Sequence, residues 1–248
     1  MPTPLVKYDN SLNQVQLSKL SATNSNIFFA LCHQFKERGT ETITISFDDL
    51  KRLSQWKGGR DPARFAENLY SVMEKIIQMS IITKTDKIAT FLTLFSKFTV
   101  DNENKLLTAE ISPHFTYLLN DLQADFTRWE LPEFLSLKSN YAKTLYRHLK
   151  QFRSTGMFTT SIEHFRHLMN VPKAYPIHEV TRRVIDPAIE ELRPIFPGLN
   201  WSYKKEKGAG NRGRGGTVTG IIFIFNTQIL FFEEYKQIEV QPISEGRG

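Results

Sequence analysis

Hydrophobic residues recur with helical spacing along residues 161–196 and predict two helices joined by a turn. Ser161 is placed to cap the first helix, the turn covers residues 170–176, and the second helix begins near Ile177. The second helix is apolar on one side and charged on the other, and Pro187 within it allows a bend. This pattern is typical of a helix-turn-helix, whose second helix can enter a major groove. The apolar side consists of Val180, Val184, Ile185, Ala188, Ile189 and Leu192.

The same pattern occurs earlier in the chain, where residues 46–53 repeat the order of cap, apolar, acidic, apolar, basic and leucine positions found in residues 161–168. Each copy is followed by sequence in which hydrophobic and polar residues alternate as in β-strands. A duplicated helix-turn-helix with a trailing hairpin predicts an α+β fold of two tandem winged-helix domains related by internal duplication. Two unrelated amphipathic helix pairs are the alternative. Continued without a gap, the register pairs Phe65 with Val180, Leu69 with Val184, Met73 with Ala188 and Ile77 with Leu192.

The strands of the two wings are expected where this alternation is found. After the first copy we expect three strands, at 81–85, 88–100 and 105–111. After the second copy we expect two strands, at 199–207 and 217–225, on either side of a loop rich in glycine and arginine. Both copies are therefore expected to carry a wing.

The expected domain boundaries follow from these elements. The stretch that joins the two copies is acidic and aromatic and lacks glycine, which indicates a packed connector and not a flexible one. The role of the last segment stays open. The expected divisions are an N-terminal winged helix at 1–125, a connector at 126–137, a C-terminal winged helix at 138–226 and a C-terminal extension at 227–248.

The distribution of charge indicates a polyanionic partner. The chain has 32 Lys and Arg against 26 Asp and Glu, a formal net charge of +6 at pH 7. The excess lies in the second half, because residues 138–153 contain basic residues and no acidic one, and residues 201–216 contain basic residues with Glu206 alone opposing them. A basic face of this kind is typical of nucleic-acid binding. An ordinary solvated surface, the alternative, would mix its signs more evenly.

The cysteine content and the hydropathy of the chain limit the class of protein further. The single cysteine, Cys32, excludes a disulfide framework and a cysteine-rich zinc site, and its expected state is a buried thiol. The chain lacks a run of about 18 apolar residues that would span a bilayer, and its first residues lack the pattern of a secretory signal. We therefore expect a cytoplasmic protein.

Candidate DNA contacts lie in the helix-turn-helix of each copy and on the loop after the second copy. Arg182 and Arg183 are the best candidates for base contacts, because arginine can bond guanine through two donors. The basic, glycine-rich loop suits contact with phosphates. For any single arginine the alternative is a surface ion pair, for example with Glu179 or Asp186. The full set of candidates is Arg182, Arg183, Lys173, Lys204, Lys205, Lys207, Arg212, Arg214, Lys57, Arg60 and Arg64.

The same loop matches a dinucleotide-binding fingerprint, and we reject that match. Gly208, Gly210 and Gly213 have the required spacing, but the fingerprint needs a helix after it, whose N-terminus faces the pyrophosphate. Here a strand is expected to follow. The chain also lacks the glycine-rich, lysine-containing loop of nucleotide hydrolases.

A DNA-nicking activity is disfavoured by the histidines and tyrosines. Such an enzyme would need an exposed tyrosine nucleophile and a metal-holding pair of histidines separated by one residue. His164 and His167 are three residues apart, and Tyr141 and Tyr146 fall on the apolar face of their helix. We therefore expect no catalytic residues, no metal and no cofactor.

Six segments between Leu5 and Phe225 form a pattern that is more specific than a helix-turn-helix alone. They are FTRWEL at 126–131, LKS at 137–139, YAK-x-LYR-x-LKQFR at 141–153, FR-x-L at 165–168, VPK-x-Y at 171–175 and RRVI-x-PAIEEL at 182–192. With these segments the chain resembles the plasmid replication initiators, which bind iterons through two tandem winged helices. The part after Asn226 is not matched to the family pattern.

The resemblance implies a mechanism without catalysis. Such initiators bind direct repeats of an origin as monomers, bend and help to open an adjacent AT-rich region, and recruit the host replication initiator and the replicative helicase. Many also dimerise through the first domain and, as dimers, repress their own gene at an inverted repeat. For this chain the resemblance implies a plasmid-encoded protein of the bacterial cytosol, in equilibrium between monomer and homodimer, with no membrane partner. The N-terminal domain would contact DNA and dimerise, and the C-terminal domain would be the main DNA reader.

The resemblance also implies roles for individual residues. Arg182 and Arg183 would read bases, and Arg60 and Arg64 would contact the other end of each repeat. The wing residues that would hold the DNA backbone are Lys204, Lys205, Arg212 and Arg214. The alternative is a transcriptional repressor that uses the same double winged helix and has no role in initiation, because both functions require only DNA binding.

Overall fold

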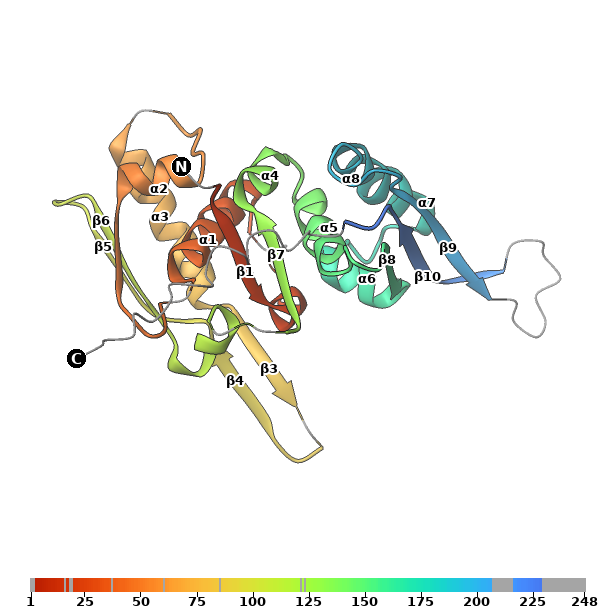
Figure 1. The fold of residues 1–248 in the computed structure, drawn as a ribbon, viewed down its shortest axis with the longest axis horizontal. Helices are drawn as coiled ribbons and strands as arrows, with labels where there is room; N and C mark the ends of the chain where they lie inside the picture. The colour runs from red at the N-terminus through yellow and green to blue at the C-terminus, as the bar shows by residue number, and fades with distance from the viewer. Residues whose placement is uncertain are drawn as a thin grey trace, which may run out of the picture.

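The computed structural model describes residues 3–15, 17, 20–36, 38–59, 61–84, 86–120, 122, 124–206 and 216–228. These residues form two winged-helix units arranged along the longest axis of the molecule (Figure 1). A pair of antiparallel strands, β1 (Leu5–Asp9) and β7 (Phe126–Glu130), lies between the two units. No helix in the described part of the chain is long and apolar enough to cross a membrane.

The first unit contains a helix-turn-helix and a three-stranded antiparallel sheet. Its sheet has the order β2-β6-β5, so that the strand before the helix-turn-helix lies at one edge and the last strand lies in the centre. The turn between β5 and β6 forms the tip of the first wing. The elements are α1 (Ala22–Phe35), β2 (Ile43–Ser46), α2 (Phe47–Leu53), α3 (Pro62–Ile77), β5 (Phe95–Asp101) and β6 (Leu106–Ile111).

The second unit repeats this topology. Its sheet has the order β8-β10-β9, again with the first strand at an edge and the last strand in the centre. The predicted α+β fold of two tandem winged helices is thereby confirmed. The elements are α5 (Asn140–Gln151), β8 (Met157–Ser161), α6 (Ile162–Met169), α7 (Ile177–Val180), the π-helical turn η4 (Thr181–Ile185), α8 (Asp186–Leu192), β9 (Asn200–Glu206) and β10 (Thr217–Ile224).

Equivalent serines start the helix-turn-helix in both units, as the sequence predicts. The Ser46 hydroxyl accepts a hydrogen bond from the backbone N–H of Asp49 at 3.0 Å. The Ser161 hydroxyl accepts one from the backbone N–H of His164 at 3.1 Å. Each serine thus satisfies a backbone donor that the first turn of a helix leaves without an intrahelical partner.

The second helix of each helix-turn-helix, here called the recognition helix, is a single helix in the first unit and contains a π-turn in the second. The first recognition helix is α3, and the second runs through α7, η4 and α8, residues 177–192. The backbone N–H of Asp186 donates to the carbonyl of Thr181, five residues earlier, which is the π-helical pattern. Pro187 follows directly and has no N–H to contribute to a regular α-helical ladder.

The π-turn shifts the register between the two recognition helices by one residue. Phe65 with Val180 and Leu69 with Val184 are pairs of buried residues, as the ungapped register predicts. The next ungapped pair, Met73 with Ala188, is also buried on both sides, but the last pair is wrong, because Ile77 is only partly buried whereas Leu192 is fully buried. The buried residues match when one residue is inserted in the second copy: Val72 with Ala188, Met73 with Ile189 and Ile76 with Leu192.

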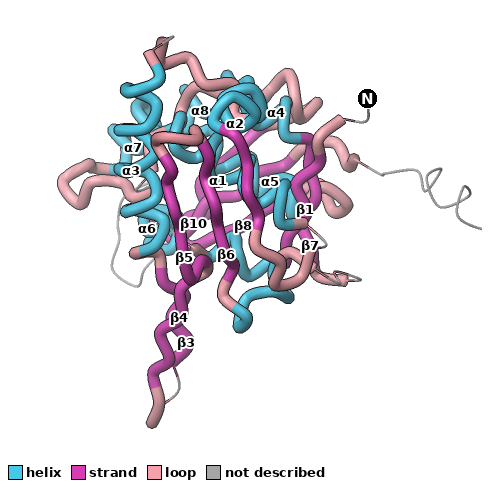
Figure 2. Tube along the Cα trace, turned by 90° about the vertical axis from the view of Figure 1, so that its left-hand side faces the viewer, coloured by secondary structure: helices cyan, strands magenta, loops and turns pink. Residues whose placement is uncertain are grey.

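The strands after the first recognition helix differ from the prediction. The expected strand at 88–100 is divided into β4 (Ala89–Thr93) and β5, because the adjacent residues Leu94 and Phe95 are both buried and interrupt the alternation. β4 pairs with β3 (Ser80–Lys84) in a separate two-stranded sheet that projects from the unit (Figures 1 and 2). Alternation alone did not distinguish this exposed hairpin from the sheet of the wing.

The stretch expected to connect the two domains forms β7 and α4 (Leu131–Ser136) and is packed between the units. Trp129 stacks on Phe134 at a centroid distance of 4.8 Å and meets Tyr146 of α5 edge-on at 5.6 Å. The buried guanidinium of Arg147, also on α5, donates to the carbonyl of Leu12 at 2.7 Å. These contacts join the N-terminal arm, the connector and the second unit through one buried cluster.

Candidate nucleic-acid interface

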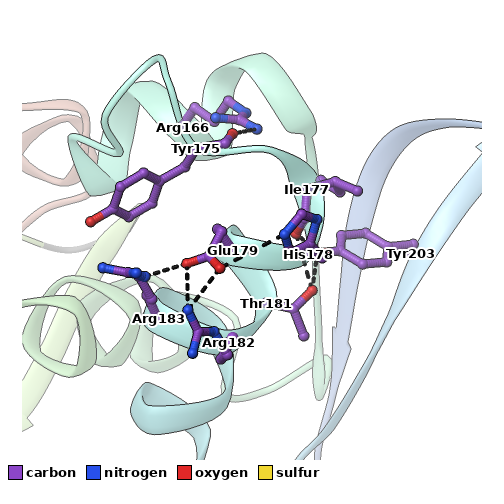
Figure 3. Close-up of polar contacts among 9 residues, drawn as sticks. All are labelled: Arg166, Tyr175, Ile177, His178, Glu179, Thr181, Arg182, Arg183 and Tyr203. Carbon is purple, nitrogen blue, oxygen red and sulfur yellow. Dashed lines mark hydrogen bonds and ion pairs between the residues drawn. The ribbon is translucent and has the colours of Figure 1, made fainter.

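The π-turn of the second recognition helix presents two arginines that share one carboxylate (Figure 3). Arg182 donates from Nη2 to both carboxylate oxygens of Glu179, at 2.7 and 3.0 Å. Arg183 donates from Nε to the second of these oxygens. The side chains of Arg182 and Arg183 are 67% and 52% exposed, whereas that of Glu179 is 18% exposed. The ion pair with Glu179 that the sequence offered as an alternative is therefore present, and both arginines still face solvent.

The electrostatics of this group favour a charged Glu179. Partial burial alone would raise the pKa of the Glu179 carboxyl, but hydrogen bonds from Arg182 and Arg183, together with their charges, outweigh burial and lower it. The same contact, with a smaller contribution from Tyr175, raises the pKa of Arg183. With one formal negative charge on Glu179 and one positive charge on each arginine, these three side chains give the turn a net charge of one positive unit.

The turn before the recognition helix supports Arg183 from one side. The Arg183 guanidinium lies 5.4 Å from the centroid of the Tyr175 ring, a cation–π distance. Arg166 of α6 donates from Nη2 to the carbonyl of Tyr175 at 2.8 Å and fixes the turn (Figure 3). Lys173, a candidate contact, is exposed in the same turn. The first helix of the motif, the turn and the recognition helix thus form one connected surface.

The candidate residues of the second wing divide into described and undescribed ones. Lys204 and Lys205 lie on β9 and are exposed. The Nζ of Lys204 is 3.7 Å from the Glu206 carboxylate, and because both side chains are more than half exposed this ion pair contributes little. The other candidates of this wing, Lys207, Arg212 and Arg214, lie outside the described residues, as does Arg60 of the first unit.

The first recognition helix carries the opposite arrangement of charge. Lys57 in the turn and Arg64 on α3 are both exposed. In the shared register Arg64 occupies the position of Glu179, and Glu67 occupies the position of Arg182. The two recognition helices therefore do not present the same side chains to a ligand.

Several basic residues of the stretch 138–153 lie in the interior of the protein and are not part of a basic face. Of the basic residues in 138–153, Lys143 and Arg147 are each 2% exposed and Lys150 is 9% exposed. The Lys143 ammonium donates to the carbonyl of Phe134 at 2.6 Å, and burial lowers its pKa to about 7. These side chains lie inside the contact between the units, because helix α5 is buried on nearly all sides there. These three residues therefore do not contribute to the exposed basic face that the charge distribution indicated.

The structure also places the residues considered for nicking chemistry. Tyr146 is fully buried and donates to the Glu133 carboxylate, while Tyr141 is partly buried on the same helix. His164 and His167 are exposed on α6. Among the described residues, no group of three or more His, Cys, Asp or Glu side chains is arranged to hold a metal ion. Cys32 is a buried free thiol, as expected, and burial raises its pKa.

Arg182 and Arg183 were identifiable from the sequence, but the side chain that holds them in place was not. Glu179 was considered only as a competitor, although its spacing of three and four residues from the two arginines is the spacing of side-chain pairs on one helix face. The hydroxyls of Thr181 and Tyr203, 2.7 Å apart, link the π-turn to β9 and had no signal in the sequence, because they are distant along the chain.

The fold and this surface define a class of protein built from two tandem winged helices with an exposed, arginine-bearing second recognition helix. Residues 5–150 match the family described as Initiator Replication protein, WH1, and residues 161–225 match Initiator Rep protein, WH2. The matches cover most of the chain. The chain belongs to this family of initiator replication proteins.

Two known proteins are similar to the chain. The probable replication protein rep of Bifidobacterium longum (strain NCC 2705) is 34% identical over 199 residues, which cover 79% of this chain and 67% of that protein. Among solved structures, the Pi initiator protein in its crystal structure in complex with iteron DNA matches with a TM-score of 0.69 at 15% identity, over 91% of this chain and 98% of that chain. The second likeness shows the fold, with both winged helices included.

Proposed function

We propose that this chain is a plasmid replication initiator that binds direct repeats, or iterons, in double-stranded origin DNA through both winged helices. The observation that carries the proposal is the placement of the two recognition helices: α3 and α7 lie toward the same edge of the molecule (Figure 2). A single duplex can therefore run past both. The similarity to the Pi initiator protein, which was crystallised in complex with iteron DNA, supports this proposal.

The described candidate residues take separate roles in this proposal. Arg182 and Arg183 read base edges in the major groove, because their guanidinium groups are exposed on the recognition helix. Lys204 and Lys205 of the second wing contact phosphates. The remaining described candidates, Lys57, Arg64 and Lys173, contact DNA from the two turns and the start of α3.

The finer parts of the proposal concern partners. The initiator acts without catalysis, opens an AT-rich segment beside the repeats and recruits the host replication initiator and replicative helicase. It dimerises through the first unit and represses its own gene as a dimer. The projecting β3–β4 hairpin supports a dimer contact there, because Phe91 is 66% exposed on it and Ile88 in its turn is 67% exposed.

The test compares two arrangements of DNA site. The purified chain is footprinted on the region upstream of its own gene, and thymines are probed with permanganate to detect melted DNA. An initiator protects several direct repeats and makes thymines in the adjacent AT-rich segment reactive when host initiator is added. Protection of a single inverted repeat without melting would instead identify a transcriptional repressor.

A further inference from the structure

Glu179 lies at the centre of the surface proposed to read DNA, where a negative charge opposes binding. Its carboxylate is held under Arg182 and Arg183, with 18% of its side chain exposed against 67% and 52% for the two arginines. His178 approaches the same carboxylate at 3.7 Å (Figure 3). A carboxylate in this place lowers the positive potential that attracts phosphates. Its presence there therefore calls for a physical explanation.

The geometry of the ion pairs orients both guanidinium groups. Arg183 contacts Glu179 through Nε, the nitrogen nearest its own backbone, so its two terminal nitrogens lie beyond the ion pair. Arg182 contacts both carboxylate oxygens through a single terminal nitrogen, Nη2. Each guanidinium therefore keeps donors that Glu179 does not use, and an arginine can bond a guanine edge through two donors. A fixed orientation reduces the entropy cost of such binding. Tyr175 limits the movement of Arg183 from the other side.

Stability alone does not account for this arrangement. Ion pairs between exposed side chains contribute little to folding, and two of the three partners are more than half exposed. The first recognition helix has the same fold with Arg64 in the position of Glu179 and Glu67 in the position of Arg182. A helix in this position therefore does not need the carboxylate to form.

We infer that Glu179 is a positioning residue that sets the sequence specificity of the second recognition helix. It holds Arg182 and Arg183 for contact with base edges and reduces their attraction to the phosphates of non-cognate DNA. Specificity is a difference of two affinities, and this residue acts on both of them. The inference rests on the proposed function, because it assumes that the second recognition helix reads bases.

The experiment uses the full chain and four proteins: wild type, Glu179→Gln, Glu179→Ala and, as a matched control, Glu190→Gln. Glu190 is an exposed acid of α8, so its change removes the same charge from the same recognition helix. Affinity is measured at several salt concentrations on two duplexes, the repeat that wild type selects from a random pool and a scrambled duplex of equal length. Urea unfolding midpoints check that each variant is folded.

The inference predicts a loss of discrimination. Glu179→Gln and Glu179→Ala bind the scrambled duplex more tightly, with a salt slope steeper by about 0.9 for each arginine that becomes free to neutralise a phosphate. The ratio of cognate to scrambled affinity falls roughly tenfold, as expected when one recognition element is removed. Repeated selection with the variants gives a site with weakened preference at the base pairs that Arg182 and Arg183 read.

Three results would overturn the inference. The first is that Glu179 variants change both affinities by the same factor as Glu190→Gln, which would make the residue an ordinary surface charge. The second is an altered preference at one base pair with unchanged scrambled affinity, which would make Glu179 itself a base contact. The third is a lowered unfolding midpoint with an unchanged affinity ratio. Failure of the proposed function is distinct, because wild type itself would then select no repeat.

Discussion

The hydroxyl of Tyr203 on β9 lies 2.7 Å from the hydroxyl of Thr181 in the π-turn of the recognition helix. Thr181 also donates to the carbonyl of Ile177 at 3.2 Å, so the start of the recognition helix, its π-turn and the wing are joined (Figure 3). Partial burial raises the pKa of Tyr203, which keeps its hydroxyl protonated at neutral pH. Hydrogen bonds therefore link the wing to the segment that carries Arg182 and Arg183.

The coupling between these two hydroxyls is measurable in a double-mutant cycle. Thr181→Val and Tyr203→Phe should each destabilise the chain, and their effects on the free energy of unfolding should be non-additive by about 1 kcal/mol, the net value of one such hydrogen bond. The free energies are obtained from urea unfolding of the two single variants and the double variant. Additive effects would show that the two hydroxyls do not interact.

Arg182→Ala and Arg183→Ala should weaken binding selectively. Each change removes the donors that reach a base edge, so affinity for the cognate repeat should fall roughly 10- to 100-fold while affinity for scrambled DNA changes little. Fluorescence anisotropy on the two duplexes checks this. Equal decreases on both duplexes would assign the arginine to a phosphate.

Lys204→Ala and Lys205→Ala should weaken binding to every sequence. Each removes a cation from β9, and the slope of log affinity against log salt should become shallower by about 0.9 for each phosphate that the variant no longer neutralises. Titrations of cognate and scrambled duplexes between low and high salt provide the slope. A slope equal to that of wild type would remove these lysines from the interface.

His148 should make the fold sensitive to acid. Burial, and after it the charges of Arg147 and His164, lower the pKa of His148 to about 3 from 6.5. Because the unfolded chain binds this proton as the pH falls through 6.5 and the folded chain does not, stability is lost between pH 6.5 and about 3, by up to about 1.4 kcal/mol per pH unit. The loss ends where the folded protein itself becomes protonated.

The matching variant is His148→Phe. The His148 ring stacks on Phe158 at a centroid distance of 5.1 Å, so a phenyl ring keeps the stack and removes a buried Nε2 that has no hydrogen-bond partner in the described part of the structure. Urea unfolding at successive pH values should show that the free energy of unfolding of the variant rises relative to that of wild type as the pH falls below 6.5. A constant difference between the two free energies of unfolding over this range would show that His148 is not the source of the acid sensitivity.

The sequence was sufficient for the fold wherever local pattern and tertiary packing agree. The caps Ser46 and Ser161 and the buried pairs of the first two helical turns were predictable, because they depend on spacing within one element. The β3–β4 hairpin was not, because alternation is the same whether a strand lies in the wing sheet or projects alone. The π-turn was not predictable either, because the insertion of one residue into a helix leaves its amino-acid composition nearly the same.

The sequence was sufficient to identify the basic residues of the candidate site, but it did not show what surrounds them. Exposure of Arg182 and Arg183 follows from their position opposite the apolar face. The burial of Lys143 and Arg147 does not, because α5 is covered by the N-terminal arm and the connector, which are distant from it in the sequence. Basic residues in a run can therefore belong to a surface or to an interface between units, and only the tertiary structure distinguishes the two.

Hydroxyl-radical footprinting on a single repeat shows whether both winged helices contact one duplex. We expect two protected segments on the same face of the DNA, separated by about one helical turn of 10.5 base pairs. Arg182→Ala should remove protection of one segment, and Arg64→Ala should weaken the other. A single protected segment that Arg64→Ala leaves unchanged would show that the first unit does not contact the DNA.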